Sequence, residues 1–97
     1  MLPCAALLYI LASRRDGTLY IGVTSDLGRR ASEHRTDIVD GFTKRYGVRS
    51  LVYVEFHATM AEAILREKRI KKWRRVWKIM LIEEGNPAWC DLYDEIL

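Results

Sequence analysis

The sequence predicts one α+β domain, and three observations lead to this expectation. Three short apolar runs, Leu7–Ala12, Leu19–Val23 and Leu51–Phe56, have the length and composition of β-strands. Capping residues mark two helix starts, one near Asp26 and one at Thr59. A chain of 97 residues is near the lower size limit for a hydrophobic core, so we expect the whole chain to form a single domain.

The first two apolar runs are predicted to form a β-hairpin, because the segment Ser13–Gly17 between them is rich in turn-forming residues. Tyr9 and Tyr20 then lie near facing positions on the two strands. The longer apolar stretch Leu2–Ala12 has no basic segment before it and is too short to span a bilayer. We therefore interpret its second half as a buried strand rather than as part of a signal peptide.

A short helix is predicted over about Asp26–Arg35, with Ser25 or Asp26 as its cap. Arg30 and His34 are four residues apart on this helix and share one face. Residues 37–47 are expected to form a loop that contains two glycines. Three side chains of this loop are available to contact a ligand: Lys44, Arg45 and Tyr46.

The longest predicted helix begins at Thr59, since Thr59 and Glu62 have the spacing of a capping box. Its predicted apolar stripe consists of Ala63, Ile70, Trp73, Trp77 and Leu81. On an ideal helix Glu67 lies about 60° from the centre of that stripe, and a helix break near residues 72–74 leaves this placement unchanged. Its carboxylate is expected to face partly toward the sheet, where an acid is costly unless a cation meets it.

Positive charge is concentrated in one segment of the chain. Between Arg66 and Lys78 there are eight basic residues and one acidic residue, Glu67, which gives this segment a charge of +7 in a chain of net charge +3. A concentrated basic face is typical of proteins that bind a phosphate backbone, although a solvated helix surface produces the same pattern. Trp73 and Trp77 do not distinguish these alternatives, because aromatic residues at helical spacing usually anchor a core.

The cysteines and histidines argue against a zinc site. Cys4 and Cys90 lie near opposite ends of the chain, and His34 and His57 are isolated, so the spacing of a zinc ligand set is absent from the sequence. We expect both cysteines to be reduced in a cytoplasmic protein.

Seven segments, taken in their order along the chain, resemble a known family. They are Leu8-Tyr9-Ile10, Tyr20-Ile21-Gly22, Asp26-Leu27 with Arg30 and His34, Gly41–Gly47, Leu51–Glu55, Arg66-Glu67-Lys68 and Asn86–Trp89. The chain resembles small stand-alone members of the GIY-YIG nuclease superfamily, and more distantly the nuclease domains of excision-repair and homing endonucleases. It departs from the family at Leu7-Leu8-Tyr9, where the glycine and isoleucine of the first triplet are absent and the tyrosine is kept.

This resemblance implies a three-stranded antiparallel sheet flanked by helices, with a single-metal phosphodiesterase site. Glu67 would hold Mg²⁺ or Mn²⁺, since a carboxylate suits such hard cations. Tyr20, helped by Tyr9, would orient or deprotonate the attacking water, and Arg30 would brace the scissile phosphate. Further substrate contacts would come from His34, Lys44, Tyr46, Asn86, Lys71 and Lys72.

These residues also have structural explanations. Tyr9 and Tyr20 suit ordinary strand positions with satisfied hydroxyl groups. Glu67 can form an ion pair with Lys71 one helical turn later, and Asn86 before a proline is a common turn residue. Their joint occurrence in the family's order favours a functional site.

Three functions follow from these alternatives. The first is a metal-dependent endonuclease that cuts branched, damaged or single-stranded DNA in repair or recombination, with RNA as an open alternative. The second is a nucleic-acid-binding module without significant cleavage. The third is a protein-interaction domain that uses the acidic residues Asp91, Asp94 and Glu95. The complete set of Tyr20, Arg30 and Glu67 favours the first; the sequence indicates no membrane partner and leaves the oligomeric state open.

Overall fold

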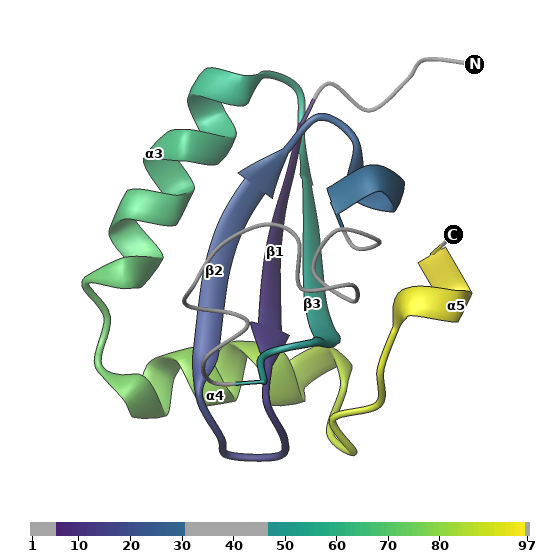
Figure 1. Ribbon diagram of the computed structural model, residues 1–97. Helices are drawn as coiled ribbons and strands as arrows, with labels where there is room; N and C mark the ends of the chain where they lie inside the picture. Colours follow the sequence, from purple (N-terminus) through teal and green to yellow (C-terminus); the bar gives the residue numbers. More distant parts are fainter. Residues whose placement is uncertain (1–5, 31–46, 97) are drawn as a thin grey trace.

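The computed structural model describes residues 6–30 and 47–96 and contains a three-stranded antiparallel sheet with helices packed against it (Figure 1). The strands are β1 (Ala6–Ala12), β2 (Leu19–Thr24) and β3 (Ser50–His57), in the order β2-β1-β3. Each strand boundary lies within one residue of its predicted position. Every residue of the central strand β1 is buried, because β1 has a strand on each side and is covered on both faces. The predicted α+β fold class is confirmed.

The register of the hairpin fixes the relation between the two candidate tyrosines. β1 and β2 pair antiparallel, with Tyr9 opposite Gly22 and Tyr20 opposite Leu11. Tyr9 and Tyr20 are therefore diagonal neighbours on one face of the sheet rather than direct cross-strand partners.

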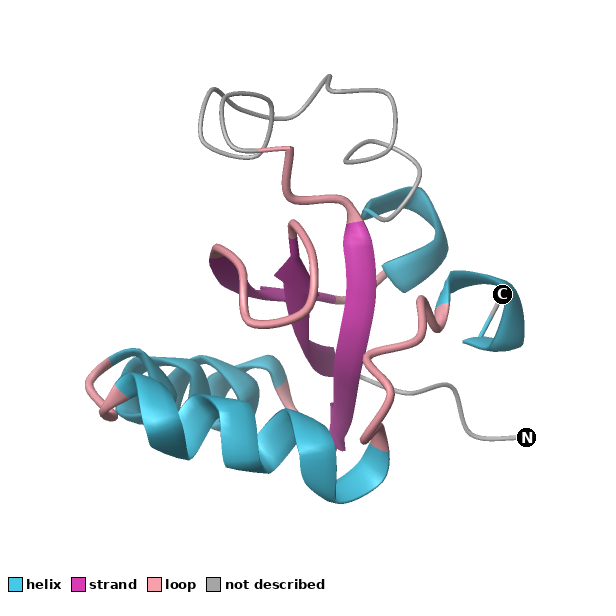
Figure 2. Cartoon of the chain, turned by 90° about the horizontal axis from the view of Figure 1, so that it is seen from below, coloured by secondary structure: helices cyan, strands magenta, loops and turns pink. Residues whose placement is uncertain are grey.

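Two apolar clusters cover the two faces of the sheet. On one face, Leu8 and Ile10 of β1 pack with Ile70 of α3 (Met60–Lys71) and Ile82 of α4 (Arg75–Gly85). Figure 2 shows both long helices together on this side of the sheet. The cluster on the other face contains Tyr9 with Leu7, Leu11, Leu27, Val48 and Leu51. Tyr9 thus lies on the face of the sheet that α3 and α4 do not cover, buried in this second cluster.

The helix α3 begins where the capping box predicts. Thr59 has an extended backbone, and its Oγ1 accepts the backbone N–H of Glu62 at 3.1 Å and donates to the Glu62 carboxylate at 3.2 Å. The helix ends at Lys71, and α4 begins at Arg75 in a different direction (Figure 1). None of the helices in the described residues combines the length and the apolar character needed to cross a bilayer.

The prediction of one continuous apolar stripe is wrong beyond α3. Ala63 and Ile70 are buried as predicted, but Trp77 is 51% exposed, and α4 buries Ile82 instead. The change of direction between the helices explains this difference, because the angular spacing counted along α3 does not continue into α4. Trp73 and Trp77 meet edge to face at this corner, with ring centroids 6.4 Å apart.

The segment that follows α4 covers the outer edge of β3. The backbone N–H of Leu51 donates to Oδ1 of Asp91 at 3.1 Å, and the N–H of Leu92 donates to the Leu51 carbonyl at 2.7 Å. These bonds occupy backbone groups of an edge strand, and α5 (Tyr93–Ile96) follows. The Asp91 carboxylate therefore stabilises the edge of β3, which weighs against the prediction that it binds a partner protein. The side chain of Asp94 is not among those that the structure describes.

Candidate active site

The four residues predicted to perform chemistry come from four different segments. Tyr9 lies on β1, Tyr20 on β2, Arg30 in the helical turn 27–30, and Glu67 on α3. The structure groups the first three on the sheet face opposite the long helices and places Glu67 on the helix that runs beside β2 (Figure 1).

The two tyrosine rings and Arg30 form a contact group. The ring centroids of Tyr9 and Tyr20 are 6.3 Å apart, with an interplanar angle of 33°. Nε of Arg30 donates to the Tyr9 hydroxyl at 3.3 Å. Tyr9 is 1% exposed, whereas Tyr20 is half-buried and lines an open hollow. Of the two tyrosines, Tyr20 is therefore the one that can meet a substrate.

The helical turn that carries Arg30 starts at a capped end. Oδ1 of Asp26 accepts the backbone N–H of Arg29 at 3.1 Å, and the Arg30 N–H donates to the Asp26 carbonyl at 3.1 Å. Of the two caps considered from the sequence, Asp26 is the one observed. This capped turn carries Arg30, whose Nε reaches the Tyr9 hydroxyl.

Gly22 makes the tyrosine group possible. A Cβ atom at this position would lie 2.6 Å from the hydroxyl oxygen and 2.7 Å from Cζ of Tyr9. Only glycine leaves room for the Tyr9 ring to lie across β2. The sequence contains a signal for this role, because an isolated glycine inside a strand often marks a close approach, but the family motif alone did not assign it one.

The buried position of Tyr9 determines its protonation state. Burial raises the pKa of Tyr9 from 10.0 to about 12, partly offset by the hydrogen bond from Arg30 and reinforced by Tyr20. Tyr9 therefore keeps its proton at neutral pH and is poorly suited to act as a general base there. Of the two tyrosines, Tyr20 is the one open to a pocket.

This raised pKa predicts a pH dependence of stability. Between pH 10.0 and about 12 the unfolded chain ionises Tyr9 while the folded protein keeps it neutral, so the free energy of unfolding falls as the pH rises. The contribution is complete below pH 10.0 and is lost as the pH passes through about 12, with a limit of about 3 kcal/mol. Urea unfolding of wild type and Tyr9→Phe across this range should show a steeper fall for wild type. Equal slopes would contradict the assignment.

The Glu67 side chain is largely buried, as a placement facing partly toward the sheet would require. Its side chain is 17% exposed, and the Nζ of Lys71 lies 3.5 Å from its Oε2. The ordinary helix ion pair considered above is therefore also present. Lys71 is 53% exposed, and a pair so open to water contributes little stability, so the ammonium group can leave the carboxylate at small cost.

Two pockets, lined by opposite ends of α3, show in which direction α3 runs along β2. Met60, the first residue of α3, lines a hollow of about 340 Å³ with residues 23–26 and Arg30, whereas Lys71 lines one of about 590 Å³ with residues 18–21. α3 therefore runs antiparallel to β2. Glu67 precedes Lys71 by one turn, about 6 Å along the axis. On this spacing Glu67 lies nearer to the middle of β2 than Lys71 does.

The single carboxylate of Glu67 suits a hard divalent cation that is held weakly. Within residues 6–30 and 47–96, no group of three or more His, Cys, Asp or Glu side chains gathers as a metal cage. Zinc generally requires such a set. Mg²⁺ and Mn²⁺ instead suit carboxylate oxygen, and Mg²⁺ commonly binds through one or two carboxylates, substrate phosphates and water. A single carboxylate at Glu67 matches a site for Mg²⁺ or Mn²⁺ rather than a zinc site.

The other predicted substrate contacts are distributed unevenly. His34, Lys44 and Tyr46 lie outside the described residues. Lys71 lines the hollow that Tyr20 also lines. Lys72 is exposed at the C-cap of α3, where its backbone N–H donates to the carbonyls of the preceding turn. The structure therefore brings Lys71 to the candidate site and leaves Lys72 at its margin.

Asn86 lies near β3, on the opposite edge of the sheet from β2. Its Nδ2 donates to the carbonyl oxygens of Val52 at 3.1 Å and Cys90 at 2.8 Å, and its Oδ1 accepts the Cys90 N–H at 2.9 Å. The side chain is buried, and these bonds fasten the C-terminal segment to β3. Turn chemistry explains its contacts, and a role in substrate binding stays a prediction.

A polar cluster on β3 and α3 was not singled out from the sequence. Glu55 accepts from the Tyr53 hydroxyl at 2.7 Å and from Nε of Arg66 at 3.1 Å, and it contacts Nε2 of His57 at 2.6 Å. Burial raises the pKa of Glu55, but these hydrogen bonds outweigh it and hold the pKa below its usual value. Burial and the bond to Glu55 raise the pKa of Tyr53. The alternation of polar side chains along β3 is the sequence signal for this cluster.

This cluster also reaches α3 beside Glu67. Arg66 is held to β3, and the next residue of a helix projects about 100° away around the axis. The bond between Glu55 and Arg66 therefore ties α3 to β3 at the residue next to Glu67.

Comparison with known proteins agrees with this geometry. The model of the GIY-YIG catalytic domain matches residues 5–80. The UPF0213 protein SERP0126 of Staphylococcus epidermidis is 37% identical over 70 residues, which cover 72% of this chain and 85% of that protein. The UPF0213 protein SSP2268 of Staphylococcus saprophyticus is 38% identical over 71 residues, covering 73% of this chain and 87% of the relative.

A solved structure shows the same architecture. The solution NMR structure of the UPF0213 protein BH0048 from Bacillus halodurans aligns with a TM-score of 0.55 and 27% identity, covering 87% of this chain and 88% of that chain. The family match extends over most of the sequence and includes Tyr9, Tyr20, Arg30 and Glu67. The chain therefore belongs to the GIY-YIG catalytic domain family, a family of nucleases.

Proposed function

We propose that this protein is a divalent-metal-dependent endonuclease that hydrolyses phosphodiester bonds in DNA and acts in repair or recombination. Family membership supports nuclease activity in general. The observation that carries the specific proposal is the grouping of Tyr9 of β1, Tyr20 of β2 and Arg30 of the following turn, on a sheet whose edge strand β2 lies beside the helix that bears Glu67.

Glu67 is the residue that would hold the cation. A bound divalent ion neutralises the phosphate and the departing oxygen. Arg30 would bind the same phosphate, and its bond to the Tyr9 hydroxyl fixes the plane of its guanidinium. A fixed guanidinium fork suits two phosphate oxygens and the negative charge that grows on them in the transition state.

Tyr20 is the residue that would contact the attacking water, since it lines the hollow beside Lys71. It either orients the water or, after giving up its own proton, accepts a proton from it. Tyr9 keeps its proton at neutral pH, and its ring lies beside that of Tyr20. Tyr9 therefore acts as a positioning residue that can stabilise negative charge on the Tyr20 oxygen.

The second candidate function is nucleic-acid binding without significant cleavage. The ion pair between Glu67 and Lys71 favours it, because an ammonium 3.5 Å away competes with a metal for the carboxylate. The basic segment 66–78 would still attract phosphate in the absence of any metal.

A cleavage assay separates the two candidates. The purified chain is incubated with supercoiled plasmid, single-stranded DNA, branched DNA and matched RNA, with Mg²⁺ or Mn²⁺, with a chelator, and with metal restored. We expect DNA cleavage that requires metal, stops on chelation and returns when metal is restored. Salt-sensitive binding without cleavage of any substrate would favour the binding module. Cleavage that persists in the chelator would contradict the metal dependence.

A further inference from the structure

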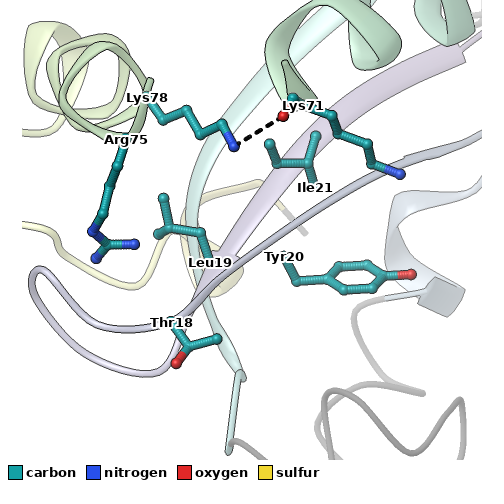
Figure 3. A pocket seen from close by; sticks show the side chains of 7 residues that line it. All are labelled: Thr18, Leu19, Tyr20, Ile21, Lys71, Arg75 and Lys78. Carbon is teal, nitrogen blue, oxygen red and sulfur yellow. Dashed lines mark hydrogen bonds between the residues drawn. The ribbon is translucent and has the colours of Figure 1, made fainter. Parts of the chain in front are cut away.

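The hollow beside Tyr20 has a strongly positive lining (Figure 3). It measures about 590 Å³ and lies between β2 and the two long helices. Its described lining consists of Thr18, Leu19, Tyr20, Ile21, Lys71, Arg75 and Lys78. Three of these described side chains are cationic and none is acidic, and one of the cations, Lys71, also pairs with the Glu67 carboxylate. Arg75 and Lys78 therefore supply most of the attraction that an anion would meet there.

Two of the cations are held in place by backbone carbonyls. Nη2 of Arg75 donates to the carbonyl oxygen of Asp16 at 2.7 Å and also to that of Gly17. Nζ of Lys78 donates to the Lys71 carbonyl at 3.3 Å. A carbonyl orients a cation without neutralising its charge, so both side chains keep their attraction for anions. Fixing them in advance reduces the entropy lost when a ligand binds.

The hollow continues along the hairpin away from Tyr20. A second hollow, of about 590 Å³, shares Thr18 and Arg75 with the first and is lined further by Ser13, Arg14, Asp16 and Gly17. Together they form a groove that follows the turn and β2. The three backbone steps from Gly17 to Tyr20 span at most about 10 Å. This length corresponds to about three nucleotides at the rise of a stacked strand, about 3.4 Å each.

We infer that this groove binds the phosphates of a single nucleic-acid strand on one side of the scissile bond, through Arg75, Lys78 and Lys71. The inference rests on the proposed function, which places the reacting phosphate beside Tyr20. Leu19 and Ile21 add apolar surface between the cations, and sugars and bases offer complementary faces. The turn residues Asp16 and Gly17 take part indirectly, because their carbonyls position Arg75.

Binding without metal tests the inference independently of catalysis. Fluorescence anisotropy of a labelled single-stranded oligonucleotide is measured over a range of salt concentrations, with the full chain and without divalent cations. Arg75→Ala and Lys78→Ala should each raise the Kd about 5- to 10-fold and lower the salt dependence by about 0.7 in log–log slope. Arg69→Ala is the matched control, since Arg69 is exposed on α3 outside the described lining, and should change the Kd less than about twofold.

The possible outcomes separate the groove from its alternatives. Equal weakening by all three substitutions would overturn the inference in favour of diffuse basic attraction. Displacement of the oligonucleotide by polyglutamate as readily as by unlabelled strand would overturn it in favour of an acidic peptide. Because Arg75 also fastens the hairpin turn, thermal unfolding is measured for each variant, and Lys78→Ala provides the result if Arg75→Ala unfolds.

The failure of the proposed function remains distinguishable from failure of the groove. A chain that binds through Arg75 and Lys78 but never cleaves would contradict the endonuclease proposal and support the groove. A chain that cleaves while both substitutions bind the strand like wild type would contradict the groove alone.

Discussion

Glu67→Gln should abolish metal-dependent cleavage while leaving the fold and nucleic-acid binding intact. Glutamine keeps the size of the side chain and removes the charge that would hold the cation. Among the described residues the carboxylate pairs with the exposed ammonium of Lys71, so little stability is lost. The cleavage rate should fall at least about 100-fold, as when a group that stabilises transition-state charge is removed. Rates are measured by plasmid nicking with saturating Mg²⁺.

Glu62→Gln is the matched control for this substitution. Glu62 lies on the same helix, is exposed, and belongs to the capping box, a position where glutamine is equally accepted. This variant should cleave like wild type. Binding of single-stranded DNA to Glu67→Gln should be unchanged or tighter, because a negative charge near phosphate is removed. Full cleavage by Glu67→Gln, or equal loss in both variants, would be incompatible with Glu67 as the metal ligand.

Gly22→Ala should lower both stability and cleavage. The new Cβ would lie 2.6 Å from the Tyr9 hydroxyl oxygen, closer than real Cβ contacts, and the buried Tyr9 ring has no free space to enter. Either the ring or β2 must shift, at a cost of about 1 to 3 kcal/mol. For a domain of this size each kcal/mol lowers the Tm by about 4 to 8 °C. The shift also disturbs the bond from Arg30, so the cleavage rate should fall with the Tm.

Two comparisons isolate the steric cause. Gly85 ends α4, and an added Cβ there meets nothing within 4 Å, so Gly85→Ala should be neutral or slightly stabilising. In a Tyr9→Leu background the cost of Gly22→Ala should shrink by more than about 0.5 kcal/mol, because the atoms that clash have been removed. An identical cost in both backgrounds, measured by urea unfolding, would exclude the contact with Tyr9 as the cause.

Much of the fold could be predicted because its signals are local. The three strands are apolar runs bounded by turn residues, and the start of α3 is marked by the capping box of Thr59 and Glu62. The break between α3 and α4 was considered only as an option, since residues 72–74 contain neither glycine nor proline. The change of direction there depends on packing against the sheet, which no local pattern specifies. The exposure of Trp77 followed from the same cause.

Part of the candidate site could likewise be predicted from the sequence, and part could not. The order of the motifs identified Tyr9, Tyr20, Arg30 and Glu67, and the structure adds how the first three meet. Sequence reasoning missed the cluster around Glu55, because its function depends on which face of β3 the helix α3 covers. His34, Lys44 and Tyr46 stay predictions, since they lie outside the described residues.

The location of Tyr9 on the central strand gives the site a rigid half and an adjustable half. β1 is paired on both sides and buried throughout, so Tyr9 belongs to the part of the protein that opens last. Glu67 instead lies on α3, at the periphery of the sheet. This helix contacts the sheet through the buried residues Ala63 and Ile70 and through the ion pair of Arg66. A small tilt of that helix would move the carboxylate without moving the tyrosines. Under the proposed function, one site could thus meet phosphates presented at different angles.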